Sequence, residues 1–210
     1  MYIAIEGTKG TGKSTLLENL KRKLQQDGID FQMFAPTKAM PEEIWWEKAY
    51  CYYCQDDVFL DSLYTARANY HASQIDFDGS LVLGDRSILT SYVTRWPHDG
   101  LKCLLPYLDQ IRHKEFLVPL PDLVLYLDLP LDITLSRLAQ RGRNYGLHDE
   151  QEDQLMRAKK AYTTLLSYKN ELGMADLQYQ LVDAKQKPED LLENVYALVV
   201  KQLEKCDLYQ

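Results

Sequence analysis

The sequence predicts an α/β fold of three layers, in which helices cover both faces of a five-stranded parallel sheet. Five short apolar segments rich in β-forming residues alternate with longer segments that have helical periodicity. This alternation is typical of strand–helix–strand units, whose strands run parallel and are buried on both faces. The chain has 210 residues, enough for one sizeable core, so we expect a single domain over residues 1–210.

The expected elements follow one another along the whole chain. Strands are predicted at residues 2–6, 31–36, 80–85, 122–129 and 179–184. Helices are predicted at residues 14–28, 41–75, 87–118 (with a turn at 96–100), 130–142, 149–171 and 188–205. Proline or glycine near several helix ends supports these boundaries, as with Gly28 after the first helix and Pro130 at the start of the fourth.

Composition and charge exclude several classes of function. The net charge of −7 argues against binding of duplex nucleic acid, which requires a basic surface. No apolar run approaches the roughly 18 residues of a membrane span, and no signal peptide opens the chain, so we expect a cytoplasmic protein that contacts neither membrane nor nucleic acid. The four cysteines form neither a disulfide framework nor a plausible zinc site, because no second ligand pair matches the spacing of Cys51 and Cys54.

The segment GTKGTGKS, residues 7–14, matches the G-x-x-x-x-G-K-S pattern of a phosphate-binding P-loop at every fixed position. It also follows an expected strand and opens an expected helix, which is the context that the motif requires. In such a loop, backbone N–H groups and the helix N-terminus point at phosphate oxygens. We therefore expect Lys13 to reach the β- and γ-phosphates of a nucleotide and the Ser14 hydroxyl to bind Mg²⁺.

Two further features lie at predicted strand or helix ends. Asp85 ends the third strand, where a carboxylate can hold Mg²⁺ or accept a proton, and Arg86 beside it offers a fork for phosphate. Arg137 and Arg141 share a helix face, and Arg143 follows a glycine. Three guanidinium groups around a glycine suit an arginine-bearing lid, which we expect at residues 137–150. The alternatives are a structural Asp–Arg pair and a solvated basic helix end.

The order and spacing of four segments resemble the thymidylate kinase family and the related deoxynucleoside kinases. These segments are GTKGTGKST, LVLGDRSILTSYVTR, PDLVLYLDLPLDITLSRLAQRG and LVDAKQKPEDLLENV. The resemblance covers nearly the whole chain. It implies transfer of a phosphoryl group from ATP, with Mg²⁺, to a small acceptor that is either a nucleoside monophosphate such as dTMP or a nucleoside. It also allows a homodimer, which is common among these kinases.

The resemblance implies roles for individual residues. Those implied to bind ATP are Gly7, Thr8, Lys9, Gly10, Thr11, Gly12, Lys13, Ser14, Thr15, Arg137 and Ala184. Those implied to act in catalysis are Lys13, Asp85, Arg86, Arg141 and Arg143, with Ser14 and Asp85 at the metal. Those implied to contact the acceptor are Arg67, Arg86, Thr90 and Arg95. For Arg67, an arginine on a helix surface is an equally good interpretation.

Three departures from the family leave the acceptor open. Lys9 stands where thymidylate kinases usually have an acid, and Ala35 stands where both groups usually have an acid before proline. Ser87 and residues 93–95 depart from the thymidylate kinase pattern after Asp-Arg. Ser87 and the spacing of the lid arginines favour the nucleoside kinases. A monophosphate acceptor brings its own nucleophile and needs cations more than a base, so we favour a monophosphate kinase over a nucleoside kinase. A regulatory NTPase and a nucleotide-binding pseudoenzyme are the remaining alternatives.

Overall fold

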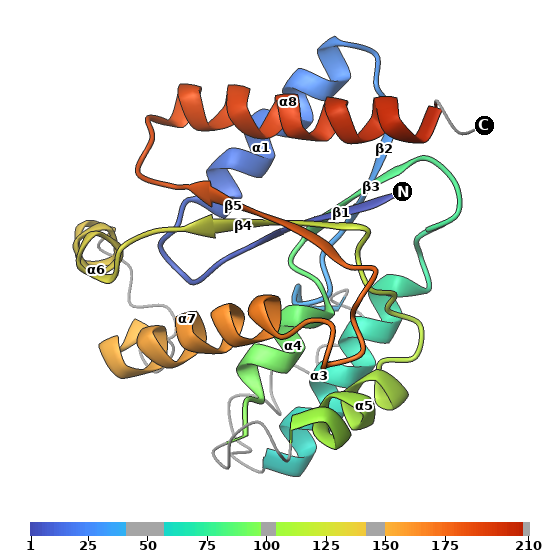
Figure 1. The fold of residues 1–210 in the computed structure, drawn as a ribbon, viewed down its shortest axis with the longest axis vertical. Helices are drawn as coiled ribbons and strands as arrows, with labels where there is room; N and C mark the ends of the chain where they lie inside the picture. Colours follow the sequence, from blue (N-terminus) through green and yellow to red (C-terminus); the bar gives the residue numbers. More distant parts are fainter. Residues whose placement is uncertain (41–56, 98–103, 142–149, 208–210) are drawn as a thin grey trace.

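A computed structural model describes residues 1–40, 57–97, 104–141 and 150–207 of the chain. Its centre is a five-stranded sheet in which every pair of neighbours is parallel, in the order β2-β3-β1-β4-β5 (Figure 1). The strands are β1 (Tyr2–Glu6), β2 (Phe31–Phe34), β3 (Leu81–Asp85), β4 (Leu123–Asp128) and β5 (Gln178–Asp183). The predicted sheet is confirmed, although β2 ends two residues earlier than expected.

Helices follow the strands in the predicted alternation. They are α1 (Lys13–Gln26), α3 (Asp57–Ala72), α4 (Ile88–Thr94), α5 (Leu104–Lys114), α6 (Leu131–Gln140), α7 (Glu152–Ser167) and α8 (Pro188–Asp207). Of the helix predicted at 41–75, the first part, 41–56, lies outside the described residues. Among the described residues, no helix has the length and apolar character needed to cross a membrane.

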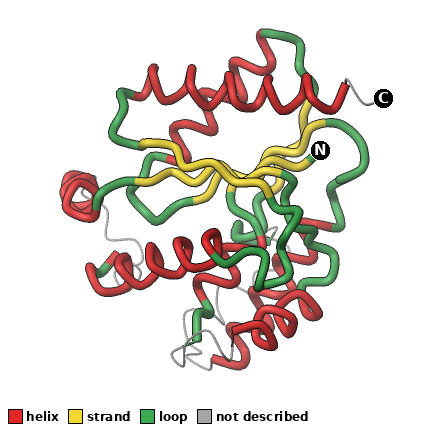
Figure 2. Tube along the Cα trace, in the orientation of Figure 1, coloured by secondary structure: helices red, strands yellow, loops and turns green. Residues whose placement is uncertain are grey.

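The sheet separates two hydrophobic clusters, because side chains alternate along each strand. On β1, Tyr2 and Ala4 belong to one cluster, whereas Ile3 and Ile5 belong to the other. Helices α1 and α8 cover one face, and α3, α4, α5 and α7 cover the opposite face (Figures 1 and 2). The three-layer α/β/α architecture expected from the sequence is therefore confirmed.

The crossover connections of β1 and β3 leave the sheet on opposite sides. The chain leaves β1 toward α1 on one face, and it leaves the neighbouring β3 toward α4 on the other. In open parallel sheets, ligands bind in the crevice that such a divergence opens at the carboxyl ends of the strands. The pairing of Ile5 with Asp85 brings these two strand ends to the same level of the sheet.

Candidate functional site

The phosphate loop is a tight turn between β1 and α1. Gly10 lies at its crest with φ +88°, in the left-handed region that costs an L side chain energy. A Cβ atom at Gly10 would lie 3.0 Å from Cγ2 of Thr134 and 3.2 Å from Cγ of Leu138. The loop therefore packs directly on α6, and only glycine allows this approach.

Lys13 folds back into the loop that it follows. Its Nζ donates hydrogen bonds to the carbonyl oxygens of Gly7 at 2.6 Å and Thr8 at 2.8 Å, and to Oγ1 of Thr11 at 3.4 Å. Burial lowers the pKa of Lys13 to about 7, helped by the charge of Arg86 and opposed by the charges of Glu6 and Asp85. The Lys13 side chain is thus buried in the loop, where a bound phosphate would favour its charged form.

Asp85 and Arg86 lie across the crevice from the phosphate loop. Asp85 is the last residue of β3, and Arg86 follows it with φ +80°, which is unusual for a residue other than glycine. The Arg86 N–H donates to the carbonyl oxygen of Ile5 at 3.2 Å, and the Tyr2 hydroxyl donates to the Arg86 carbonyl oxygen at 3.3 Å. Such a conformation persists only where neighbouring groups hold it, and it is found most often at functional sites.

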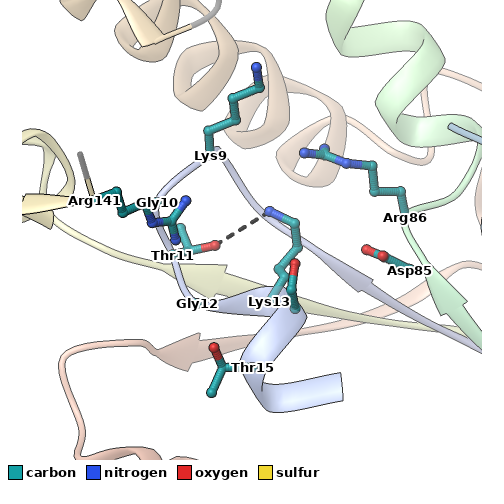
Figure 3. A pocket seen from close by; sticks show the side chains of 10 residues that line it. Lys9, Gly10, Thr11, Gly12, Lys13, Thr15, Asp85, Arg86 and Arg141 are labelled. Atoms are coloured by element: carbon teal, nitrogen blue, oxygen red, sulfur yellow. Dashed lines mark hydrogen bonds between the residues drawn. The ribbon is translucent and has the colours of Figure 1, made fainter. Parts of the chain in front are cut away.

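These elements enclose a pocket of about 180 Å³. Figure 3 shows the end of Lys13 turned toward Thr11, with the guanidinium groups of Arg86 and Arg141 on opposite sides of it in this view. The residues that line the pocket are Lys9, Gly10, Thr11, Gly12, Lys13, Ser14, Thr15, Asp85, Arg86 and Arg141. Every one of them is among the site residues predicted from the sequence.

Residues 3–157 match the family model described as an AAA domain. The chain belongs to the AAA-domain family. It is also similar over its length to thymidylate kinases: 27% identical over 214 residues to that of Pseudomonas entomophila, covering 98% of each chain. The thymidylate kinase of Acinetobacter baylyi is 29% identical over 216 residues, covering 95% of this chain and all of the relative.

A solved structure extends the similarity in fold. It is described as deoxyadenosine kinase from M. mycoides with the products dCMP and a flexible dCDP bound. Its TM-score is 0.64 at 23% identity, and the match covers 98% of this chain and 100% of that one. The thymidylate kinase relatives confirm the resemblance to P-loop nucleotide kinases, and the solved structure adds a likeness in fold. The sequence identities do not single out one kind of kinase.

Other residues predicted for the site lie outside the pocket lining of this AAA-domain chain. Arg137, on α6, donates from Nη2 to the carbonyl oxygen of Ala184 at 3.1 Å, so these two predicted ATP-binding residues are neighbours. Arg67, on α3, donates from Nη1 to the carbonyl oxygen of Thr37 at 3.3 Å and lies over the ring of Tyr64. Arg143 lies outside the described residues.

Arg95 takes part in a network of ion pairs between helices. Its Nη1 lies 2.7 Å from Oε1 of Glu115, whose side chain is fully buried, and its Nε lies 2.8 Å from Oδ1 of Asp61. Lys114 pairs with the other oxygen of Asp61 at 2.7 Å. Arg95, predicted from the sequence to contact the phosphoryl acceptor, is thus paired with two carboxylates of the protein.

The donor set of the pocket fits a nucleotide phosphate chain and Mg²⁺. Residues 7–15 would hold the phosphates, and the Ser14 hydroxyl and the Asp85 carboxylate would hold the cation. Among the described residues, no three His, Cys, Asp or Glu side chains form a group that could hold a metal by themselves. Mg²⁺ is commonly bound through one or two protein oxygens together with substrate phosphates and water, which is the arrangement that this site offers.

Two residues of the site were not found by sequence reasoning. Glu6, the last residue of β1, is fully buried and accepts hydrogen bonds from three side chains, among them Tyr162 on α7. The one feature of the sequence that could have indicated Glu6 is its position, as an acid at the end of an apolar strand directly before the phosphate loop. Tyr162 gave no signal, because an aromatic residue on the apolar face of a helix is usually a core residue.

Proposed function

We propose that this protein transfers the γ-phosphoryl group of ATP to a nucleoside monophosphate, with Mg²⁺, as in the thymidylate kinases that it resembles. The observation that carries the proposal is the single pocket formed by the phosphate loop, Asp85, Arg86 and Arg141. Thymidylate or a related deoxynucleotide is the acceptor that we expect, because the full-length curated relatives are named thymidylate kinases.

The residues of the pocket divide the work of phosphoryl transfer. The loop amides and Lys13 would bind the donor phosphates, and Arg86 and Arg141, which line the same pocket, would stabilise the charge of the transferred group. Phosphoryl transfer depends mainly on positioning and on charge stabilisation, so cations fixed before the reaction lower its barrier. Mg²⁺, bound through Ser14 and Asp85, would supply further neutralisation of the phosphate oxygens.

Nucleoside phosphorylation is the second candidate function. The solved deoxyadenosine kinase of similar fold and the Asp85-Arg86-Ser87 sequence favour it. A nucleoside hydroxyl must lose its proton during the reaction, and a general base must lie within hydrogen-bond reach. Ala35 provides no carboxylate after β2, so Asp85 would have to accept that proton as well as face the metal.

A panel of acceptors distinguishes the two functions. ADP release from Mg·ATP is measured with each deoxynucleoside, each deoxynucleoside monophosphate and the ribose counterparts. We expect the highest kcat/KM with a deoxynucleoside monophosphate. A preference for a nucleoside would establish the second candidate instead, and ATP binding without turnover on any acceptor would leave a nucleotide-binding pseudoenzyme.

A further inference from the structure

The carboxylate of Glu6 is the most completely bonded buried acid in the site. Its side chain is 0% exposed. Oε1 accepts from the backbone N–H and from the hydroxyl of Ser87, both at 2.7 Å. Oε2 accepts from the hydroxyls of Thr90 at 2.9 Å and Tyr162 at 2.7 Å. These donors come from the β3–α4 turn, from α4 and from α7, so one side chain of β1 joins three other parts of the chain.

An apolar side chain would fill this position without the cost of removing a charge from water. β1 is otherwise apolar and buried, and its neighbours Ile5 and Ala4 show that the strand needs no polar group for packing. A buried carboxylate is kept where its hydrogen bonds fix an arrangement that apolar contacts cannot specify. The question is which arrangement Glu6 fixes.

Glu6 is linked to both the backbone and the side chain of Arg86, through Ser87 and Thr90. Ser87 follows Arg86 directly, and its N–H and hydroxyl both donate to Oε1 of Glu6. These two bonds hold the backbone next to Arg86, whose own φ is +80°. Thr90, whose hydroxyl binds Oε2, accepts a hydrogen bond from Nη1 of Arg86 at 3.3 Å. The backbone and the guanidinium of Arg86 are therefore both tied to the same carboxylate.

The negative charge of Glu6 also favours the charged forms of the two neighbouring cations, Arg86 and Lys13. Burial disfavours the charged form of Arg86, but the nearby Tyr162, Glu6 and Asp85 together raise its pKa. Lys13 also receives part of its countercharge from Glu6. The two cations can therefore stay close together beside the pocket while no phosphate lies between them.

We propose that Glu6 is a positioning residue for phosphoryl transfer, which holds the strained Arg86 turn and directs the Arg86 guanidinium at the transferred phosphate. This inference rests on the proposed function, because it assigns Arg86 to the reacting group. Glu6 itself touches neither substrate nor metal. It acts through Ser87, Thr90 and Tyr162.

The test is the variant Glu6→Gln, which keeps the shape of the side chain and removes its charge. The amide oxygen can still accept from Ser87. The amide nitrogen can donate to the hydroxyl of Thr90, since hydroxyls accept as well as donate, and it then competes with Arg86 for that oxygen. We expect kcat to fall by about tenfold or more, whereas the KM for ATP changes by less than about threefold. The phosphate loop is expected to keep its own contacts.

A matched control is Tyr126→Phe. The Tyr126 ring packs against Tyr162 at 5.1 Å between centroids, is buried on β4, and is not among the described donors to Glu6. This control should leave kcat unchanged. If Glu6→Gln does not fold, Tyr162→Phe removes one of the four donors, and kcat should then fall by a smaller factor with the same unchanged KM.

Three results would overturn the inference: an unchanged kcat in folded Glu6→Gln, a rise in the KM for ATP without a fall in kcat, or, where Glu6→Gln does not fold, an unchanged kcat in Tyr162→Phe. An NMR measurement separates failure of the inference from failure of the proposed function. Hydrogen exchange at the Arg86 Nε–H and the Ser87 N–H should be slow in the natural protein and faster in Glu6→Gln. If the natural protein phosphorylates no acceptor, the proposed function fails, and unchanged exchange in the variant would sink the positioning role as well.

Discussion

Because the phosphate loop packs tightly on α6, Gly10→Ala should destabilise the protein. Gly10 has φ +88°, and a Cβ there would lie 3.0 Å from Cγ2 of Thr134, 3.2 Å from Cγ of Leu138 and 3.3 Å from the Thr134 carbonyl oxygen. Thr134 cannot turn away freely, because its Oγ1 donates to the carbonyl oxygen of Pro130 at 3.0 Å. The added methyl group must therefore move either the loop or the helix.

Two terms make up the expected loss of stability. A left-handed conformation costs an L residue about 1–2 kcal/mol. Overpacking of a close contact costs about 1–3 kcal/mol more. The free energy of unfolding of Gly10→Ala should therefore fall by about 2–5 kcal/mol, and the KM for ATP should rise because the loop that binds the phosphates is displaced.

Urea unfolding of two variants isolates the contact from the backbone term. Gly28, in the turn after α1, also has a positive φ, +70°, but a Cβ there meets nothing within 4 Å. Gly28→Ala should lose only the backbone term of about 1–2 kcal/mol. If Gly10→Ala and Gly28→Ala lose equal stability, a Cβ at Gly10 causes no overpacking against α6, and the predicted close contact is wrong.

Three further predictions concern charges. Lys13→Ala should lower kcat by about 10²-fold or more in the ADP-release assay, whereas loss of the partly exposed Lys21 on α1 should not; near-normal turnover would remove the loop lysine from the mechanism. Arg95→Ala should lower the free energy of unfolding in urea by about 3–5 kcal/mol, because it strands the buried Glu115 carboxylate, and the loss should greatly exceed that of an exposed ion pair. Burial raises the pKa of Tyr92 from its ordinary value of 10.0 to about 12. The free energy of unfolding should therefore decline as the pH rises from 10 toward 12, and it should decline less steeply in Tyr92→Phe.

The local parts of the candidate site are the ones that the sequence indicates. The P-loop pattern fixes a turn by its glycines and places Lys13 and Ser14 at known offsets, so the chemistry is contained in eight adjacent residues. Asp85 and Arg86 were placed by a rule of topology, since functional residues gather at the carboxyl ends of parallel strands. The P-loop pattern depends only on neighbours in the sequence, and the strand-end rule depends only on the order of strands and helices. Both can therefore be recognised without knowing which distant side chains meet.

Contacts between distant side chains could not be predicted in this way. Glu6 and Tyr162 are 156 residues apart, and nothing in either segment indicates the other. The same holds for Arg95, whose pairing with Glu115 depends on how α4 packs against α5. In both cases the role of a charge is decided by the partner that the fold brings to it, and a single sequence carries no record of that partner.

The acids at the strand ends show how this difference bears on function. Four of the five strands end in an acid, namely Glu6, Asp85, Asp128 and Asp183. All four stand at strand ends, but the sequence points only to Asp85, because Arg86 follows it and the resemblance implies a role for it. In the structure Glu6 already binds hydroxyl and amide donors, Asp128 pairs with Lys159 at 2.7 Å, and Asp183 accepts from the backbone N–H of Lys185 at 2.9 Å.

Asp85 is the one acid of the four that lines the pocket, and it shares the lining with Lys9, Lys13, Arg86 and Arg141. The buried Glu6 also supplies countercharge to Lys13 and Arg86, but its hydrogen bonds tie it to the protein. Asp85 is therefore the strand-end acid left to meet Mg²⁺ or an acceptor hydroxyl. A nucleoside would need Asp85 for both tasks, whereas a monophosphate brings its own nucleophilic oxygen and leaves Asp85 to the metal, which favours a monophosphate acceptor.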